Sequence, residues 1–369
     1  MLRAACSERQ LCQPVAYGGG VTVPERRRPR LALLAARSQP LPGNLDQPRA
    51  RADVVPTDAA GLPAVLPGAE VLLLWDFSSP ALRRAWPQAD ALRWVHVAAA
   101  GVDAVMFEDL RASDVAVTNA RGVFDGPIAE FVLASILAHD KQLHLSKSLQ
   151  RQSVWRHREL TRTAGSRVLV VGTGGIGRAT ARLLRAVGLQ VRGAGRTARE
   201  HDGDFGTVVP SAELAQHAGW ADHLVLAAPL TGQTHRLVDA GVLAALKPGA
   251  HLVNVGRGAL LDEAALVQAL RPGRTAASLD VFEQEPLPAG HPFWELDNVH
   301  VSAHMSGDVA GWRDALAGQS LANLDRWIAG EPLENVLHKD RGYVPGPAET
   351  GRELSASGPE PGRHARQAR

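Results

Sequence analysis

The sequence predicts an α/β protein with two domains, a doubly wound parallel sheet of the Rossmann type and a smaller, flavodoxin-like α/β domain. Three observations predict this fold. Short apolar runs alternate with helical patterns over residues 31–302, as is typical of parallel sheets. Within them, the run VGTGGIG at residues 171–177 carries an apolar strand into glycines just before a helical pattern. The chain of 369 residues is long enough for two domains with a cleft between them.

The smaller domain begins with four apolar runs. We expect its strands at residues 31–36, 71–75, 92–97 and 115–117. The last helical pattern, with an apolar stripe from Trp312 to Ile328, is expected to return to it. The predicted boundaries are 31–122 with 303–337 for the smaller domain, 123–302 for the larger one, and 1–30 and 338–369 for the tails. We expect both tails to be disordered, because their Gly, Pro, Ser and Arg residues bury little apolar surface.

The larger domain begins with a long apolar helix over residues 127–145, with Asp125 and Gly126 at its start. After the glycine turn, strands are expected at 189–194, 224–228, 251–255, 276–281 and 299–302, and helices at 211–217, 239–246 and 262–270. Ser211, Asp239 and Asp262 are the predicted N-caps of these three helices.

The glycine turn is the strongest single motif. Gly172, Gly174 and Gly177 have the G-x-G-x-x-G spacing, which permits a tight turn, close approach of a pyrophosphate, and packing of helix on strand. The pyrophosphate would lie on the amides at the helix N-terminus. A glycine-rich turn without any ligand is the alternative, and the motif alone does not exclude it.

The end of the second strand favours NADP(H). An NAD-binding unit places an Asp or Glu there, on the ribose 2′-hydroxyl, but this chain has Gly195, Arg196 and Thr197. A guanidinium and a hydroxyl suit a 2′-phosphate, which a carboxylate would repel. NAD(H) use, with Arg196 as an ordinary solvated side chain, remains the alternative.

Composition narrows the class of protein. The net charge of +2 comes from basic tails, so residues 31–338 are slightly acidic, which argues against nucleic acid as the main partner. Cys6 and Cys12, both close to the N-terminus, are too few to hold a fold or a structural zinc, and a reducing cytoplasm fits them. No run is long enough to span a membrane, and the apolar segment after Arg26–Arg28 is too short for a signal sequence.

Three polar residues follow the carboxyl ends of predicted strands, where ligands bind in open α/β sheets. They are Arg257, Glu285 and His304. Each taken singly is as well explained by a surface or turn residue, but together they predict one site. A metal site of His300 with His304 is excluded, because four residues of strand separate them by about 13 Å. We therefore expect no metal.

Eight blocks of sequence resemble the D-isomer-specific 2-hydroxyacid dehydrogenases, especially the glyoxylate/hydroxypyruvate reductase branch. They cover residues 31–337 and read AGVD, TNARGVFDGPIAEFVL, VGTGGIG, APLTGQT, LKPGAHLVNVGRGALLDEAAL, SLDVFEQEPLP, HPFWELDNV and SAHMSG. The resemblance implies hydride transfer between NAD(P)(H) and a small 2-oxo or 2-hydroxy acid. It makes the smaller domain the substrate domain and the larger one the dinucleotide-binding domain. The Gly195–Arg196–Thr197 sequence departs from the family's NAD-type acid and agrees with members that use NADPH.

The resemblance also assigns roles to residues. It makes Arg257, Glu285 and His304 the catalytic triad, with Gly101 and Val102 binding the substrate carboxylate together with Arg257. The implied cofactor-binding residues are Gly172, Gly174, Gly175, Ile176, Gly177, Arg196, Thr197, Pro229, Thr234, Val255, Gly256, Asp280, Ser306 and Gly307. Of these, Asp280, Ser306 and Gly307 would hold the nicotinamide. Trp155 matches an arm that reaches the partner's active site in some relatives, which implies a homodimer.

Charge then predicts the mechanism. Reduction leaves negative charge on the carbonyl oxygen, so imidazolium His304 would donate the proton, Glu285 would hold the pKa of His304 up, and Arg257 would clamp the carboxylate. Two other functions remain open: a dinucleotide-sensing interaction protein resembling a corepressor, and a phosphoglycerate dehydrogenase. The identity of the 2-oxo acid is left open.

Overall fold

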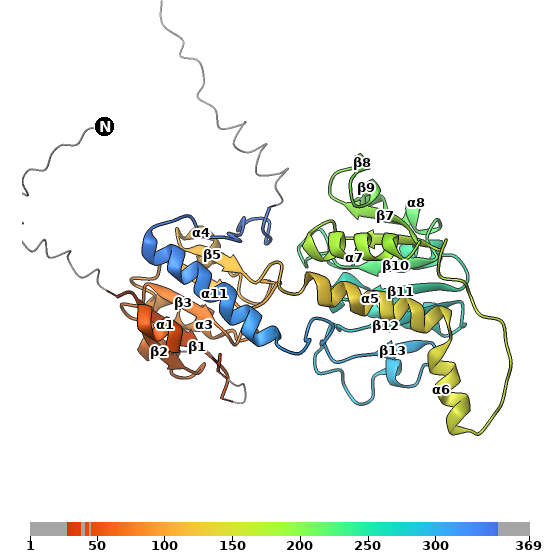
Figure 1. Ribbon diagram of the computed structural model, residues 1–369, viewed down its shortest axis with the longest axis horizontal. Helices are drawn as coiled ribbons and strands as arrows, with labels where there is room; N and C mark the ends of the chain where they lie inside the picture. Colours follow the sequence, from red (N-terminus) through yellow and green to blue (C-terminus); the bar gives the residue numbers. More distant parts are fainter. Residues whose placement is uncertain (1–27, 38–40, 44–45, 346–369) are drawn as a thin grey trace, which may run out of the picture.

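The computed structural model describes residues 28–37, 41–43 and 46–345, which form two α/β domains side by side (Figure 1). The tails predicted to be disordered lie outside these residues except for 28–30 and 338–345, and Cys6 and Cys12 lie outside them as well. The first domain holds a five-stranded sheet and the second an eight-stranded sheet, so the predicted fold class is confirmed.

The first sheet is parallel throughout, in the order β2-β1-β3-β4-β5. This is the flavodoxin-like order predicted for the smaller domain. Its strands are β1 (Arg30–Leu34), β2 (Asp53–Thr57), β3 (Val71–Leu74), β4 (Trp94–Val97) and β5 (Ala116–Asn119), and its short helices are α1 (Asp46–Arg51), α2 (Leu62–Val65), α3 (Ala81–Ala85), η1 (Trp86–Gln88) and α4 (Glu108–Ala112). Strand β2 was not predicted. It lies at the edge of the sheet and contains Pro56, which interrupts the apolar pattern.

The second sheet has the order β13-β12-β11-β10-β6-β7-β9-β8, and only β8 is antiparallel to its neighbour. Its strands are β6 (Arg167–Val171), β7 (Gln190–Gly195), β8 (Arg199–Asp202), β9 (Gly206–Pro210), β10 (His223–Leu226), β11 (Ala250–Asn254), β12 (Thr275–Leu279) and β13 (Val299–Val301). All but β8 and β9 lie where the sequence predicts strands. The two central strands β10 and β11 are fully buried, as expected for a sheet covered on both faces.

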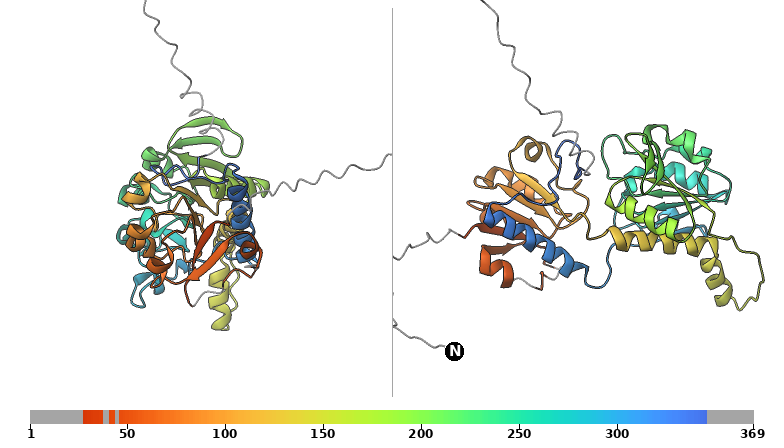
Figure 2. Two further views of the ribbon diagram at one scale, coloured as in Figure 1. Left: turned by 90° about the vertical axis from the view of Figure 1, so that its left-hand side faces the viewer. Right: turned by 45° about the horizontal axis from the view of Figure 1, so that its top comes forward.

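The long helix predicted over 127–145 is two helices. Helix α5 (Asp125–Asp140) ends at Lys141, and α6 (Leu143–Arg151) begins after Gln142, whose φ of 47° is left-handed. The predicted continuity through 145 is therefore wrong, because the left-handed residue Gln142 interrupts the helix. Helix α6 and the segment after it extend away from the domain (Figure 2), and the chain returns at Thr161, whose amide donates to the carbonyl of Asp140.

The remaining helices of the second domain are α7 (Gly175–Ala186), η2 (Ser211–Glu213), α8 (Leu214–Ala218), α9 (Ala240–Ala245), η3 (Gly258–Leu260), α10 (Glu263–Leu270) and η4 (Pro292–Trp294). Two predicted N-caps are confirmed, since Asp239 accepts from the amide of Val242 and Asp262 from that of Ala265. Ser211 is not a cap. It lies inside a 3₁₀ turn that makes no side-chain cap bond, because Pro210 precedes that turn.

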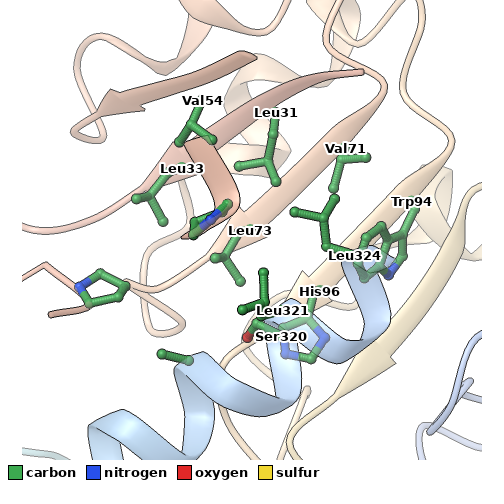
Figure 3. Close-up of a pocket in the computed structure, with 13 residues that line it drawn as sticks. Leu31, Leu33, Val54, Val71, Leu73, Trp94, His96, Ser320, Leu321 and Leu324 are labelled. Atoms are coloured by element: carbon green, nitrogen blue, oxygen red, sulfur yellow. The ribbon is translucent and has the colours of Figure 1, made fainter. Parts of the chain in front are cut away.

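Helix α11 (Trp312–Ala329) returns to the first domain, as predicted, and packs across its sheet (Figure 1). Its Leu321 and Leu324 line a small apolar pocket together with Leu31 and Leu73 of the sheet (Figure 3). The segment after α11 continues along the same domain.

The C-terminal segment, residues 338–345, is ordered against the first domain. The backbone of His338 pairs with that of Tyr343, and Lys339 donates through its Nζ to the carbonyl of Ser113. The expectation that disorder begins at residue 338 is therefore wrong for these residues, because specific hydrogen bonds satisfy their polar groups and Val344 packs against the apolar core of the first domain.

Candidate active site

The glycine turn has the geometry that a dinucleotide requires. Gly172 has a φ of 108°, and a Cβ there would lie 2.6 Å from the backbone of Ala227. A Cβ on Gly177 would lie 1.9 Å from the carbonyl oxygen of Gly172, so helix α7 packs directly on the turn. Nothing lies within 4 Å of a Cβ on Gly174, where the chain is exposed. The turn is therefore closed toward the protein and open where a pyrophosphate would approach.

Gly175 and Ile176 form the first turn of α7. A Cβ on Gly175 would lie 2.2 Å from Oδ2 of Asp125, so a carboxylate from α5 already approaches the N-terminus of this helix. Burial raises the pKa of Asp125, although Arg121 opposes the rise. The N-terminus of α7 thus interacts with the carboxyl group of Asp125, which would lie near a bound pyrophosphate.

The sequence after β7 has the character expected of a phosphate site. Gly195 packs against Thr173 of the glycine turn, since a Cβ there would lie 3.0 Å from Oγ1 of Thr173. Arg196 and Thr197 follow at once and are exposed. There is little room at 195 for the acidic side chain that an NAD-type site carries, while a guanidinium at 196 reaches solvent.

An ion-pair network holds the hairpin that follows Arg196 and Thr197. Arg178 donates to both oxygens of Asp202, at 3.1 Å, and to Asp204 at 2.8 Å, while Arg199 also donates to Asp202. Burial raises the pKa of Asp202, but the hydrogen bonds from Arg178, Arg199 and backbone amides outweigh it and lower the pKa to about 2. These bonds tie hairpin β8–β9 to helix α7 and so fix both ends of the segment that carries Arg196.

Arg257 meets the first domain at Gly101. A Cβ on Gly101 would lie 1.8 Å from Nη2 of Arg257, so the guanidinium lies directly over this glycine. Nε of Arg257 donates to both oxygens of Asp103, at 3.0 and 3.3 Å. Two predicted substrate-binding elements, 156 residues apart in the chain and in different domains, are thus brought together. Val102, beside them, is buried.

The loop of Arg257 is shaped by its neighbours. Nδ2 of Asn254 donates to the carbonyl of Arg257, and Oδ1 of Asn254 accepts from the amide of Gly256. A Cβ on Gly258 would lie 1.8 Å from the backbone of Phe282, so only glycine fits there. These contacts turn the chain so that the Arg257 side chain points toward the first domain.

His304 and Glu285 form a hydrogen-bonded pair. Nδ1 of His304 lies 2.7 Å from Oε2 of Glu285, and both side chains are partly exposed, at 46% and 36%. The bond from Glu285 raises the pKa of His304, against the effect of burial and of Arg257. Burial alone would raise the pKa of Glu285, but the hydrogen bonds from His304 and from the amide of Phe282 outweigh this effect, so the pKa is lowered. The pair therefore favours imidazolium with carboxylate. The charge of Arg257 affects the pKa of both His304 and Glu285, so the three residues predicted to share a site lie near one another.

His304 has a left-handed backbone with a φ of 50°, a conformation that costs energy for a residue other than glycine. Its loop is fixed by Asp280, which is fully buried. Oδ1 of Asp280 accepts from the hydroxyl of Ser302 and the amide of Met305, and Oδ2 accepts from the amide of Ser306. Asp280 thus positions the loop of His304, and its role in holding the nicotinamide stays a prediction.

The other predicted cofactor residues lie in loops at the same edge of the sheet. Oγ1 of Thr234 donates to the carbonyl of Pro229, closing the loop after β10. Val255 and Gly256 follow β11. Gly307 follows Ser306, and a Cβ there would lie 2.7 Å from the ring of Phe124. That these residues bind the cofactor stays a prediction.

Trp155 does not join the site. Its side chain is 98% exposed, on the segment that extends beyond α6. Within the part of the chain that the structure describes, no three His, Cys, Asp or Glu side chains are grouped to hold a metal ion. Among the same residues, no helix has the length and apolar character to cross a lipid bilayer.

Comparison with known proteins agrees with this geometry. The model of the D-isomer specific 2-hydroxyacid dehydrogenase NAD binding domain matches residues 133–306. The glyoxylate reductase of Thermofilum pendens is 30% identical over 262 residues, which span 68% of this chain and 76% of that protein. The chain belongs to the D-isomer specific 2-hydroxyacid dehydrogenase family.

Solved structures of this family have the same fold. A D-isomer specific 2-hydroxyacid dehydrogenase from Xanthobacter autotrophicus, in complex with NADPH and MES, is 33% identical with a TM-score of 0.73, over 86% of this chain and all of that one. An NADPH-dependent glyoxylate/hydroxypyruvate reductase from Sinorhizobium meliloti, in complex with NADP and malonate, is 28% identical with a TM-score of 0.72, over 86% of this chain and 99% of that one. The dehydrogenase described here is therefore an NAD(P)-dependent oxidoreductase of 2-hydroxy and 2-oxo acids, and its relatives do not favour the sensor or phosphoglycerate alternatives.

Sequence reasoning missed several residues that shape the site. Asp103 closes the AGVD block, yet its bond to Arg257 depends on how two domains meet. Asn254 stands in the LVNVGRG block, where an amide just before a glycine turn is a recognisable signal of a side chain that bonds its own loop.

Proposed function

We propose that this dehydrogenase reduces a small 2-oxo acid of the glyoxylate or hydroxypyruvate type with NADPH, forming the D-2-hydroxy acid. The observation that carries the proposal is the assembly of Arg257, Glu285 and His304, with Gly101 of the other domain beneath the guanidinium. Relatives with glyoxylate or glyoxylate/hydroxypyruvate reductase activity, named above, support the substrate class.

The residues present fit an NADP(H) molecule. The turn of Gly172, Gly174 and Gly177 leaves an exposed position for the pyrophosphate, and Arg196 with Thr197 would hold the 2′-phosphate. The dinucleotides in the two solved structures cited above support this preference over NAD(H). When bound, the reduced nicotinamide supplies a hydride to the carbonyl carbon of the substrate.

Arg257 binds the carboxylate of the substrate. Its Nε is engaged by Asp103 and its Nη1 by the carbonyl of Gly256, while Nη2 lies above Gly101. Backbone amides of Gly101 and Val102 complete the carboxylate site. A charge-assisted contact from Nη2, together with these amides, orients the substrate and polarises its carbonyl.

His304 supplies the proton. With Nδ1 held by Glu285, Nε2 is the nitrogen that faces the substrate oxygen, and imidazolium donates its Nε2 proton as negative charge develops there. Glu285 keeps imidazolium populated by its negative charge. Asp280 and Ser306 hold the loop in its left-handed conformation, so that the ring stays aligned.

We also place the enzyme in the cytoplasm as a homodimer. Apolar side chains on and after α6, namely Leu143, Val154, Trp155 and Leu160, are 46–98% exposed, and a second copy would cover them. Helix α5 packs against α7, but only five of its 16 residues are buried, so we expect it to share the dimer interface with α6 and the arm.

A substrate panel tests the proposed function. Oxidation of NADPH is followed by its absorbance with glyoxylate, hydroxypyruvate, pyruvate and other 2-oxo acids, with NADH in parallel. We expect turnover of glyoxylate and hydroxypyruvate with NADPH. No oxidation of either dinucleotide with any member of the panel would support the dinucleotide-sensing alternative instead.

A further inference from the structure

The loop that carries Glu285 is held by a second carboxylate, that of Glu263. Oε1 of Glu263 accepts a hydrogen bond from the backbone amide of Glu283 at 2.7 Å, across 20 residues of chain. Glu263 is the first residue of α10. A bond from an amide to a carboxylate is stronger than one between neutral groups. It joins the loop of Glu285 to the start of α10.

The peptide between Phe282 and Glu283 also packs on the segment that carries Arg257. A Cβ on Gly258 would lie 1.8 Å from the carbonyl carbon of Phe282 and 2.2 Å from the nitrogen of Glu283, so the two backbones are in direct contact. The segment of Gly258 continues through η3 into α10 and Glu263. Two contacts, one of packing and one of hydrogen bonding, therefore fix this peptide against the segment of Arg257.

The same loop holds Glu285 toward His304. The amide of Phe282 donates to Oε1 of Glu285 at 3.0 Å, while Oε2 of Glu285 lies 2.7 Å from Nδ1 of His304. Two successive amides of the loop thus bind two carboxylates: that of Phe282 binds Glu285, and that of Glu283 binds Glu263. A shift of the loop would therefore move Glu285 relative to the imidazole.

Glu263 is itself held by His291. Nε2 of His291 lies 3.6 Å from Oε2 of Glu263, and Nδ1 of His291 accepts from the amide of Phe293, so Nε2 carries the hydrogen in the neutral ring. Burial raises the pKa of Glu263, and the charges of Glu283 and Glu285 add to the rise. The bond from the Glu283 amide and the charge of His291 oppose it. Both carboxylate oxygens of this half-buried side chain therefore have a partner.

We infer that Glu263 is a positioning residue for the Glu285–His304 pair. It acts through the amide of Glu283 and has no contact with the substrate in this role. The inference rests on the proposed function and adds to it a residue outside the three catalytic side chains. By fixing the loop, Glu263 keeps Glu285 within bonding distance of His304. A misplacement of about 1 Å lowers a rate by about a hundredfold, so a remote bond of this kind affects kcat.

Three variants of the full chain test the inference. Glu263→Ala removes the acceptor, Glu263→Asp draws it away from the amide of Glu283, and Glu263→Gln keeps it without the charge. The first measurement is NMR titration of the His304 ring without cofactor or 2-oxo acid, with His304→Ala identifying its signal. In Glu263→Ala the pKa of His304 should fall toward the ordinary 6.5, because Glu285 is less often in place.

The second measurement is kcat of NADPH-dependent reduction against pH. Glu263→Ala should lower kcat about tenfold to a hundredfold and move the fall of the profile to lower pH, with NADPH affinity unchanged. Glu263→Asp should change the titration and the profile in the same direction by less, which keeps the experiment decisive if the Ala variant does not fold. Glu263→Gln should behave much like the unmodified protein. A Gln variant as impaired as Glu263→Ala would overturn the inference, because the charge rather than the bond would then matter.

Asp262→Ala is the matched structural control. The carboxylate of Asp262 caps α10 by accepting from the amide of Ala265, so its loss weakens the same helix end and leaves the bond to Glu283 in place. This variant should lower the melting temperature and leave the titration of His304 and the pH profile unchanged. Equal shifts in Asp262→Ala and Glu263→Ala, or no shift in either, would mean that Glu263 serves only the fold.

A double-mutant cycle tests the route through Glu285. In a Glu285→Gln background, Glu263→Ala should cause no further shift in the titration of His304, and a further shift would overturn the inference. The titration needs no substrate, so the two proposals fail separately. If no 2-oxo acid is reduced but Glu263→Ala still lowers the pKa of His304, the proposed function fails and the positioning contact stands. If reduction occurs and the titration does not change, only the inference fails.

Discussion

Nδ1 of His304 lies 2.7 Å from Oε2 of Glu285, and the bond raises the pKa of the imidazole while the pKa of the carboxyl falls. A proton donor for reduction must be charged at the working pH, and this contact is what keeps it charged. The two groups titrate as a pair, so kinetic profiles will report the pKa values of the pair.

The first prediction concerns opposing pH profiles. Reduction of the 2-oxo acid requires imidazolium and should be lost as pH rises through the raised pKa of His304, whereas oxidation of the hydroxy acid should be lost as pH falls through it. Glu285→Gln removes the negative partner, so the fall of the reductive profile should move to lower pH. Rates measured in both directions against pH check this, and two profiles that fall on the same side would contradict it.

The second prediction concerns Arg196. Arg196→Ala should weaken NADPH about tenfold to a hundredfold, the value of one charge-assisted contact, and leave NADH affinity unchanged. Ratios of kcat/KM for the two cofactors measure the effect. Arg192→Ala, on β7 over the ring of Trp220, is the matched control and should keep the NADPH preference. A ratio that stays the same in Arg196→Ala would place the 2′-phosphate elsewhere.

The third prediction concerns Asp103, which holds Nε of Arg257. Asp103→Asn keeps the size of the side chain but removes its charge, so Arg257 should lose alignment and KM for the 2-oxo acid should rise about tenfold. NADPH affinity should not change. The surface variant Asp109→Asn on α4 is the control. An unchanged KM in Asp103→Asn would mean that the substrate itself is enough to align Arg257.

The fourth prediction concerns five histidines between α5, α6 and the second sheet. Two pairs are stacked, His139 on His251 and His144 on His300, and His223 is in edge contact with both His139 and His251. Burial lowers the pKa of all five below the ordinary 6.5, to about 4 for His300. Repulsion between the histidines adds to the effect for all of them except His144, while Asp140 partly opposes it for His139 and His223.

Because the folded state binds fewer protons than the unfolded state between about pH 6.5 and pH 4, stability should be complete above that window and fall as pH falls through it. The two histidines that are buried most, His223 and His251, should contribute most to this loss. Thermal melting against pH measures the loss. In the His300→Gln variant, the melting temperature should fall less steeply as pH falls. An unmodified protein whose melting temperature is equal on either side of the window would contradict this prediction.

The fifth prediction concerns assembly. Trp155 and the apolar residues of α6 should be covered in a homodimer, so sedimentation at micromolar concentration should give twice the mass of one chain. Trp155→Ala should weaken the dimer. Trp294→Ala, at the other highly exposed tryptophan, is the control and should leave the mass unchanged. A monomer in the unmodified protein would contradict the proposed arm.

Much of the fold follows from the sequence because parallel strands are buried on both faces. Strand β6 contains the apolar run VLVV and β10 the run LVL, while β11 is fully buried although it carries His251 and Asn254. Strand β8, by contrast, reads REHD, and its Asp202 is held by Arg178 of helix α7 as well as by Arg199 of the same strand. Tertiary ion pairs of this kind leave no periodic signal.

The polar residues of the candidate site could also be predicted from the sequence, for a similar reason. Arg257, Glu285 and His304 each follow a strand, and the carboxyl ends of parallel strands share one edge of a sheet. Partners from the other domain were not predictable, because no local pattern says where two domains meet. Asp103 is one such partner. Tyr343, whose ring lies against the guanidinium of Arg196, is another, and the composition of its surroundings predicted disorder.

The most direct test of the account is the rate of NADPH-dependent reduction by His304→Ala, measured with the best acid of the panel from about pH 6 to about pH 9. Loss of general acid catalysis should lower kcat about 10²- to 10⁴-fold while NADPH affinity changes little. Near-normal turnover across this range would show that His304 is a structural residue at the end of β13 and that the proton comes from another group.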